Sequence, residues 1–227
     1  MKTLKNYFSR WEIALWCASV SIIVVSFIIF DKENYLTLIA SLIGITSLIF
    51  CAKGNPFGQV LMIIFSLIYG FISYTFSYFG EMATYLGMSL PMAVFSLVSW
   101  LKNPYGDNES EVAVNRIKAK EVGFMLLLTC VVTVIFYFIL AYLGTANLLP
   151  STISVATSFV AVYLCARRSP YFAIAYAAND VVLIVLWVLA AIQDISYLSV
   201  IVCFLVFLVN DIYSFINWLR MQKRQES

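Results

Sequence analysis

The feature that most constrains this 227-residue chain is a series of eight apolar runs, each close to 20 residues long. An α-helix needs about 20 apolar residues to cross the hydrocarbon core of a bilayer. Backbone polar groups have no water to bind there, so each run is expected to be a helix. The fold class that we expect is therefore an all-α polytopic membrane protein. The predicted spans are 12–30, 35–52, 58–79, 81–101, 122–144, 149–166, 171–191 and 195–219.

The positions of the basic residues predict an orientation for these spans. Charged residues make up only 11% of the chain, whereas soluble domains carry about 25%. With the N-terminus inside, thirteen of the 14 Lys and Arg residues are cytoplasmic and only Lys32 is external. The positive-inside rule therefore predicts that both termini lie in the cytoplasm. The formal net charge of +2 provides no basic patch for a nucleic acid.

Several kinds of chemistry are disfavoured by the composition. The chain has no histidine, which removes His-based catalysis, proton relays and metal ligation. Its five cysteines contain no Cys-x-x-Cys pair, so neither a disulfide framework nor a metal site is expected. We expect no catalytic residues, no metal and no cofactor. The first apolar run is longer than the core of a typical signal peptide, so we interpret it as a retained span.

Two parts of the chain repeat the same landmarks in the same order. Span 35–52 ends in CAKGNP and span 149–166 ends in CARRSP, and the third spans of the two units end in SWLKNP and NWLRMQ. One span between the units places them in the same orientation, as a parallel 3+1+3 repeat. The predicted units are an extra N-terminal helix (1–34), a first three-helix repeat (35–101), a cytoplasmic loop with the linking helix (102–148), a second three-helix repeat (149–221) and a cytoplasmic tail (222–227).

The loop that precedes the linking span is polar, with the sequence KNPYGDNESEVAVNRIKAK. Its part EVAVNRIKAKE is predicted to form a short surface helix. We find no chemistry in this loop.

An Asn-Asp pair lies inside two of the spans, in YAANDVV and in FLVNDIY. A carboxylate at a helix centre costs about 2.5–3.5 kcal/mol on insertion scales, so such groups usually face a cavity or a partner. Asp180 and Trp187 are seven residues apart and share a helix face. We predict a polar path between the two repeats. Its predicted substrate-binding residues are Asn179, Asp180, Trp187, Asn210, Asp211, Tyr213 and Asn217 from the second repeat, and Tyr69, Ser73, Thr84, Tyr85 and Met88 from the first.

Other roles for these acids are open at this point. Asp180 and Asp211 have a structural alternative, in which each is protonated or paired with an Asn. Glu81 and Asp194 lie in short links between spans and are expected to be solvated, with a place at the outer entrance as the alternative. No Lys or Arg lies inside a span away from its ends. By electrostatics the path should favour a cation or a neutral solute over a phosphorylated one.

Two long segments resemble the PnuC family of bacterial nicotinamide riboside transporters. They are KGNPFGQVLMIIFSLIYGFISYTFSYFGEMATYLGMSLP (53–91), with FSLVSWLKNPY (95–105), and YAANDVVLIVLWVLAAIQDISYLSVIVCFLVFLVNDIYSFINWLRM (176–221). The resemblance covers about residues 35–221. It implies import of nicotinamide riboside, an NAD precursor, across the bacterial plasma membrane by facilitated diffusion with alternating access. Transporters built from parallel repeats bind their substrate near the midplane between the repeats, so we expect the site there. The family shares the 3+1+3 arrangement with the SWEET sugar transporters.

The same resemblance implies partners and leaves alternatives. A homotrimer in the lipid bilayer is expected, with a functional link to a cytoplasmic nicotinamide riboside kinase. The family's older label, nicotinamide mononucleotide transport, fits poorly with the lack of basic residues inside the spans. Thiamine is also a cation, so a transporter of another vitamin is one alternative, and proton coupling through Asp180 or Asp211 is a second. We expect no enzyme, because these carboxylates come without a nucleophile or a metal cluster.

Overall fold

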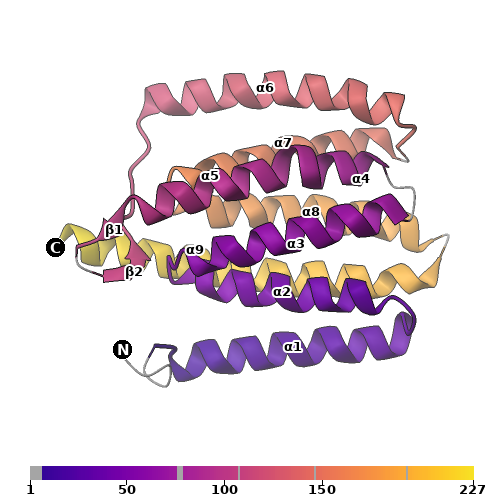
Figure 1. Ribbon diagram of the computed structural model, residues 1–227, viewed down its shortest axis with the longest axis horizontal. Helices are drawn as coiled ribbons and strands as arrows, with labels where there is room; N and C mark the ends of the chain where they lie inside the picture. Colours follow the sequence, from indigo (N-terminus) through magenta and orange to yellow (C-terminus); the bar gives the residue numbers. More distant parts are fainter. Residues whose placement is uncertain (1–6, 76–78, 107, 146, 193) are drawn as a thin grey trace.

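The computed structural model describes residues 7–75, 79–106, 108–145, 147–192 and 194–227. Eight helical segments in the described residues are long and apolar enough to cross a membrane, which confirms the predicted fold class. They lie side by side (Figure 1). They are α1 (Arg10–Phe30), α2 (Tyr35–Ala52), α3 (Phe57–Thr75), the segment Phe79–Leu101, α6 (Ala119–Tyr142), α7 (Leu148–Ala166), α8 (Tyr171–Ala191) and the segment Ile195–Glu226, which joins a short 3₁₀ turn, η3 (Ile195–Tyr197), to α9 (Leu198–Glu226). Residues 76–78 of the predicted span 58–79 lie outside the described residues.

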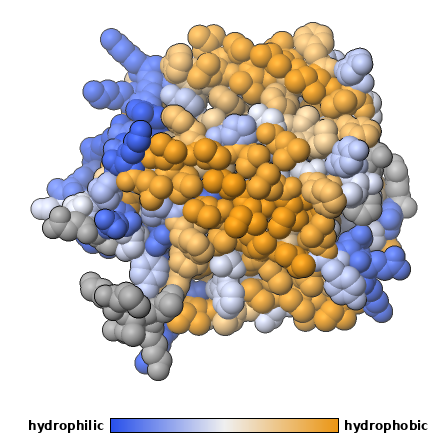
Figure 2. Space-filling view, in the orientation of Figure 1, coloured by the Kyte–Doolittle hydropathy of each residue, from blue (hydrophilic) through white to orange (hydrophobic). Residues whose placement is uncertain are grey.

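The two repeats form the centre of the bundle. Helix α6 lies at one edge and packs on α7, and α1 lies at the other edge against α2 and α9 (Figure 1). The start of α1 and the end of α9 lie at one end of the bundle, together with the described connections 53–56, 102–106, 108–118 and 167–170, and we call this the basic end. The face in Figure 2 has apolar side chains over the middle and hydrophilic ones toward the two ends, as a chain in a bilayer requires.

The fourth span is not a single regular α-helix. It consists of α4 (Phe79–Thr84), a π-helical turn η2 (Tyr85–Ser89) and α5 (Leu90–Leu101). Pro91 has no backbone N–H, so the carbonyl of Gly87 has no α-helical donor four residues later. Such a turn occurs frequently at functional sites, and here it begins at Tyr85.

The loop at 102–118 differs from the prediction. Strands β1 (Pro104–Tyr105) and β2 (Asn108–Val112) form an antiparallel hairpin, and residues 113–118 have no regular structure. The predicted short surface helix is therefore wrong. The physical reason is that the loop backbone pairs with the ends of other helices: the Val112 N–H donates to the Gly54 carbonyl at 2.9 Å, and the Asn115 N–H donates to the Arg168 carbonyl at 3.0 Å.

The predicted tail 222–227 is not separate from the last span. Helix α9 continues to Glu226, beyond the length that a bilayer needs. The extension is held by the loop, because Arg224 pairs with Glu111 and Arg116 pairs with Glu226. The loop and the end of α9 thus form one polar layer at the basic end.

Helices α2 and α7, the first helices of the two repeats, end in the same way. Gly54 and Arg168 follow them with left-handed φ angles of 66° and 58°. The N–H of each donates to the carbonyl three residues earlier, that of Cys51 or Cys165, at 2.9 Å in both cases. This is a glycine-type helix ending, and Arg168 adopts it at a cost of about 1–2 kcal/mol for a residue with a Cβ.

The substitution Gly54→Ala tests this ending. We expect it to lower the free energy of unfolding by more than the 1–2 kcal/mol or so of left-handed strain, because the new Cβ would lie 2.7 Å from Met221 Cε and 3.2 Å from Val112 Cγ1. Gly144→Ala is the matched control, since Gly144 has φ 68° with nothing within 4 Å. Thermal unfolding in detergent should rank Gly54→Ala below Gly144→Ala, and the opposite order would contradict this packing.

Candidate functional site

A cavity of about 280 Å³ lies between the two repeats. At the end opposite the basic end it is lined by residues from the connections between helices, among them Asp31, Thr145 and Asp194. Toward the basic end it is lined by Gln59, Ser96 and residues from the middle of the helices. The cavity therefore reaches from one end of the bundle into its centre.

Eight of the twelve predicted substrate-binding residues line this cavity. The second repeat contributes four of them, and the first repeat contributes the other four from α3 and the fourth span. Residues far apart in sequence are thus brought to one place. The eight residues are Asn179, Asp180, Trp187, Asp211, Tyr69, Ser73, Thr84 and Tyr85. Their role toward a substrate stays a prediction.

Asp180 and Asp211 meet at the cavity wall. Their side chains are buried, with 4% and 2% exposed, and their carboxyl groups lie close enough to interact directly. Two carboxylates this close in a buried site repel each other strongly, so one of them is expected to keep its proton. The pair then has a single negative charge. Asp180 Oδ2 and Asp211 Oδ1 are buried without a protein partner, so the pair keeps acceptor atoms at the cavity.

Aromatic rings from both repeats line the cavity. Tyr69 and Tyr85 of the first repeat lie with their ring centroids 5.0 Å apart. Trp187 and Tyr197 of the second repeat lie 5.2 Å apart. All four residues line the cavity. Faces of this kind can hold a flat ring or a cation.

The hydroxyl side chains of α7 are a part of the site that the sequence interpretation missed. Ser154, Thr157 and Ser158 of α7 contact Asn179 Oδ1 at 3.3, 2.8 and 3.0 Å, which fixes this amide at the wall. Ser66 also lines the cavity, and its Oγ is buried without a protein partner. A signal existed: Ser151, Ser154 and Ser158 follow the i, i+3, i+7 pattern of one helix face.

The charged residues of the cavity wall are all acidic among the residues that the structure describes. Asp31, Glu81, Asp180, Asp194 and Asp211 line it, without a Lys or Arg. Glu81 and Asp194 thus line the cavity at its entrance, which was the alternative to a purely solvated position. The Ser196 N–H donates to the Asp194 carboxylate at 2.9 Å and lowers the pKa of Asp194 below its ordinary value. No cluster of three His, Cys, Asp or Glu suitable for a metal ion exists in the described ranges.

Four predicted site residues lie elsewhere. Three of them belong to α9 and hold neighbouring helices: Asn210 Nδ2 donates to Ser19 Oγ at 3.0 Å, Tyr213 Oη to Glu12 at 2.9 Å, and Asn217 Nδ2 to the carbonyl of Ala52 at 2.7 Å. Successive helix residues point about 100° apart, so Asn210 cannot share the direction of Asp211. The fourth, Met88, packs in an apolar cluster with Leu140, Val155 and Phe159.

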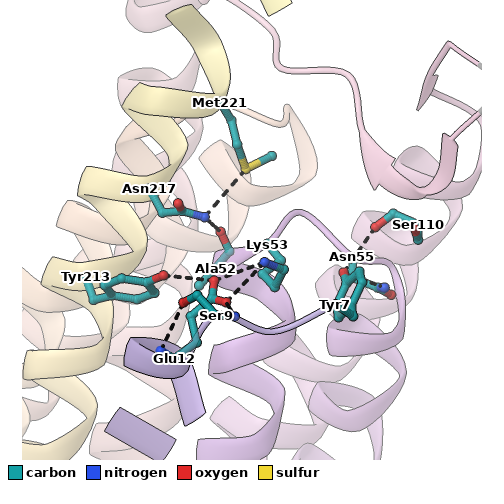
Figure 3. A network of polar contacts seen from close by, with 10 residues as sticks. All are labelled: Tyr7, Ser9, Glu12, Ala52, Lys53, Asn55, Ser110, Tyr213, Asn217 and Met221. Carbon is teal, nitrogen blue, oxygen red and sulfur yellow. Dashed lines mark hydrogen bonds and ion pairs between the residues drawn. The ribbon is translucent and has the colours of Figure 1, made fainter. Parts of the chain in front are cut away.

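The polar network in Figure 3 fastens α1 to both repeats. The Glu12 side chain, only 3% exposed, forms an ion pair with Lys53 at 3.0 Å and accepts the hydrogen bond from Tyr213. Ser9 caps the start of α1 through reciprocal bonds with Glu12. Charge and hydrogen bonding are thus satisfied at this buried carboxylate, as burial demands.

Comparison with known proteins places these features in a family context. A family model described as nicotinamide mononucleotide transporter matches residues 34–220. Two similar proteins are named nicotinamide riboside transporter PnuC. The one from Neisseria mucosa is 27% identical over 201 residues, covering 86% of this chain and 76% of the relative. The one from Haemophilus influenzae is 21% identical over 223 residues, covering 97% and 96%.

A solved structure supports the fold. The crystal structure of the vitamin B3 transporter PnuC superimposes with a TM-score of 0.81 and 24% sequence identity. The match covers 96% of this chain and 94% of that chain. Helix α1 precedes the region of the family model, and the contacts of Figure 3 are among those that attach it to the two repeats.

We predict that Glu12→Ala destabilises the protein through this attachment. It would leave Lys53 and the Tyr213 hydroxyl without their shared partner, and breaking a buried pair costs up to about 3–5 kcal/mol. Because the Lys53 side chain is 21% exposed, we expect the lower part of that range in thermal unfolding. Arg116→Ala is the control, since its exposed pair with Glu226 should contribute no more than about 1 kcal/mol. Equal stability of the two variants would refute the attachment.

Proposed function

Since this chain belongs to the nicotinamide mononucleotide transporter family, we propose that it carries nicotinamide riboside across the bacterial plasma membrane. The family consists of transporters, so the chain is a transporter and not an enzyme. Both named relatives are nicotinamide riboside transporters. The observation that carries the proposal is the charge of the cavity, which combines five acidic side chains with no Lys or Arg among its described residues.

The acidic charge of the cavity favours the riboside over its phosphorylated form. Nicotinamide riboside carries a pyridinium cation and no phosphate, and an acidic cavity attracts it. The mononucleotide adds a phosphate that would lie in low dielectric beside carboxyl groups and without a basic partner. That arrangement is unfavourable for a buried anion. We therefore propose the riboside as the substrate in spite of the family's description.

The cavity also suits the shape of this solute. Its volume of about 280 Å³ is near the lower end of the range of about 300–1,000 Å³ for small-molecule sites. We propose that the pyridinium ring stacks on the aromatic walls, where Trp187 faces the site from one repeat and Tyr69 and Tyr85 from the other. The Asp180–Asp211 pair balances its charge. Ser73, Thr84 and Asn179 supply polar groups for the ribose hydroxyls and the carboxamide.

The four residues away from the cavity are left out of this proposed site. Each already has a structural role, either in bonds from α9 to α1 and α2 or in the apolar cluster around Met88. The proposed site is therefore asymmetric, with its carboxyl pair in the second repeat and its tyrosine pair in the first. An asymmetric ligand fits such a site.

We propose facilitated diffusion with alternating access as the transport mode. The site lies between two parallel repeats, which is where transporters of this construction bind their substrates, near the midplane. The basic end is proposed to face the cytoplasm, because basic residues favour that side. A cytoplasmic kinase that phosphorylates the riboside would trap it and keep the gradient inward. We retain a homotrimer as the proposed assembly.

Proton coupling is a second candidate, favoured by one observation. Asp180 and Asp211 form a buried carboxyl pair at the cavity wall, where one shared proton and the substrate could be exchanged together. To test it, we would impose a pH gradient on proteoliposomes. Coupled transport predicts uptake that follows the gradient and a loss of this response in Asp180→Asn, whereas facilitated diffusion predicts no response in either protein.

Substrate identity is tested by comparing four solutes with the purified protein. A ligand that binds the folded state raises its melting temperature, so we expect nicotinamide riboside to do so, and the mononucleotide and riboflavin to have little effect. Labelled nicotinamide riboside should also show saturable counterflow in proteoliposomes. Thiamine is the competing cation, and stabilisation by thiamine alone would replace the riboside with another vitamin.

The variant Trp187→Ala tests the position of the ring. Loss of one stacking partner costs about 0.5–1.5 kcal/mol, so the affinity for the riboside should fall by roughly threefold to tenfold. Trp11→Ala is the matched control, because Trp11 is 84% exposed and far from the cavity lining. Unchanged affinity in Trp187→Ala would remove this residue from the site.

A further inference from the structure

We propose that two tryptophans, Trp100 and Trp218, form the gate that closes the cavity at the basic end. We use the name tryptophan clasp for these two residues, their neighbours Ser99 and Asn217, and the backbone carbonyls to which the four side chains donate. The proposal depends on the proposed transport function, because a gate matters only if a solute passes. It does not depend on which solute is carried.

The clasp consists of reciprocal hydrogen bonds between the repeats. Trp100 Nε1 donates to the Cys165 carbonyl at 2.8 Å, and Trp218 Nε1 donates to the Cys51 carbonyl at the same distance. Each tryptophan lies in the third span of one repeat, and each carbonyl lies at the end of the first helix of the other repeat. The landmarks SWLKNP and NWLRMQ of the sequence therefore reach across to CARRSP and CAKGNP.

The residue before each tryptophan makes a second bond of the same kind. Ser99 Oγ donates to the Ala166 carbonyl and Asn217 Nδ2 donates to the Ala52 carbonyl, both at 2.7 Å. Four hydrogen bonds thus join the repeats, two from each, in one arrangement used twice. Repeats related by an axis along the membrane normal have this form, so the clasp lies around that axis.

The two indoles of the clasp are fully buried and lie beyond the cavity, toward the basic end. Both indole side chains have 0% exposure, and their ring centroids are 5.4 Å apart. Phe172 closes one side, with its ring edge-on to Trp218 at 4.9 Å. On the two helices that carry the tryptophans, the cavity-lining residues nearest to them are Ser96 and Asp211, which precede Trp100 and Trp218 by about one and two helical turns. Solute in the cavity has no route to the basic end while these rings stay together.

The bonds of the clasp can be released without leaving its main acceptors unpaired. The Cys51 carbonyl also accepts the N–H of Gly54, and the Cys165 carbonyl also accepts the N–H of Arg168, both at 2.9 Å. When the tryptophans move away, each carbonyl keeps this second donor. The indole N–H groups would then face the water that enters. A contact that never breaks does not need a second donor for its carbonyl, whereas a contact that breaks when a gate opens does.

A pair of native thiols crosses the same interface. Gln59 Nε2 donates to Cys51 Sγ and to Cys165 Sγ, at 3.3 Å in both cases. The two sulfur atoms can therefore be no farther apart than twice this distance. Gln59 also lines the cavity, so the thiols lie between the cavity and the tryptophans. A chemical bridge between them would hold the clasp shut.

Mercuric ion provides this bridge and tests the gate with both tryptophans intact. In a protein with the substitutions Cys17→Ser, Cys130→Ser and Cys203→Ser, Hg²⁺ would replace the two thiol protons of Cys51 and Cys165. We expect counterflow to fall more than tenfold, riboside binding to persist, and dithiothreitol to restore flux. The same protein with Cys51→Ser cannot be bridged and should keep its flux. If the bridged protein, with one Hg²⁺ bound, carries solute at the unbridged rate, the clasp is not a gate.

Thiol labelling tests the clasp bonds directly and needs no substrate. Trp218→Phe keeps a ring but removes the indole donor, so we expect a membrane-impermeant maleimide applied at the basic end to label Cys51 and Cys165 about tenfold faster. The matched control is Trp16→Phe, because Trp16 Nε1 donates to Thr46 Oγ1 at 3.3 Å outside the clasp. Equal labelling of the two variants would overturn the proposal.

The mercury experiment and the labelling experiment together distinguish an incorrect gate proposal from an incorrect function proposal. Absence of riboside binding and flux in the unmodified protein would refute the substrate, and the labelling result would still report whether the clasp opens. The mercury arm in turn does not depend on folding of the tryptophan variant. Melting temperatures of all variants, measured beside the labelling, show whether faster labelling comes from opening or from unfolding.

Discussion

The structure depends on one constraint: inside a bilayer, every polar atom needs its partner within the protein. The constraint explains most of the polar side chains at membrane depth. Glu12 has Lys53 and Tyr213, and Asn179 has three hydroxyls of α7. Ser66, Asp180 and Asp211 each keep a buried oxygen without a protein partner, and all three line the cavity. At the cavity, these three oxygens lie where a polar solute would supply the missing partners.

The two repeats are alike at the basic end and different around the cavity. Their first helices end in the same turn, and their third spans donate the same bonds across the interface. Around the cavity the carboxyl pair belongs to one repeat and the tyrosine pair to the other. The matching contacts at the basic end suit a motion that the two repeats make together. The different side chains around the cavity suit an asymmetric solute.

The spans and the repeat were predictable because bilayer thickness fixes helix length and because landmarks recur in order. Asp180 and Trp187 were also predictable, since a spacing of seven places both on one helix face. Asn210 was not separated from Asp211, because sequence does not say which face of α9 meets the cavity and which meets α1. The hairpin and the π-turn were missed because each depends on backbone pairing that apolar periodicity does not record. The hydroxyl side chains of α7 were overlooked because single small side chains barely change a hydropathy pattern.

The loop that follows the first repeat has a mechanical consequence. Val112 is bonded to the turn after α2, and Asn115, three residues later, is bonded to the turn after α7. These turns belong to different repeats, so the loop is a tether between the two bodies that must part at the basic end. Three residues of fully extended chain span about 10 Å at most. While both bonds hold, the width of the opening is therefore set by a short piece of chain, and shortening or lengthening that piece changes the widest solute that can leave.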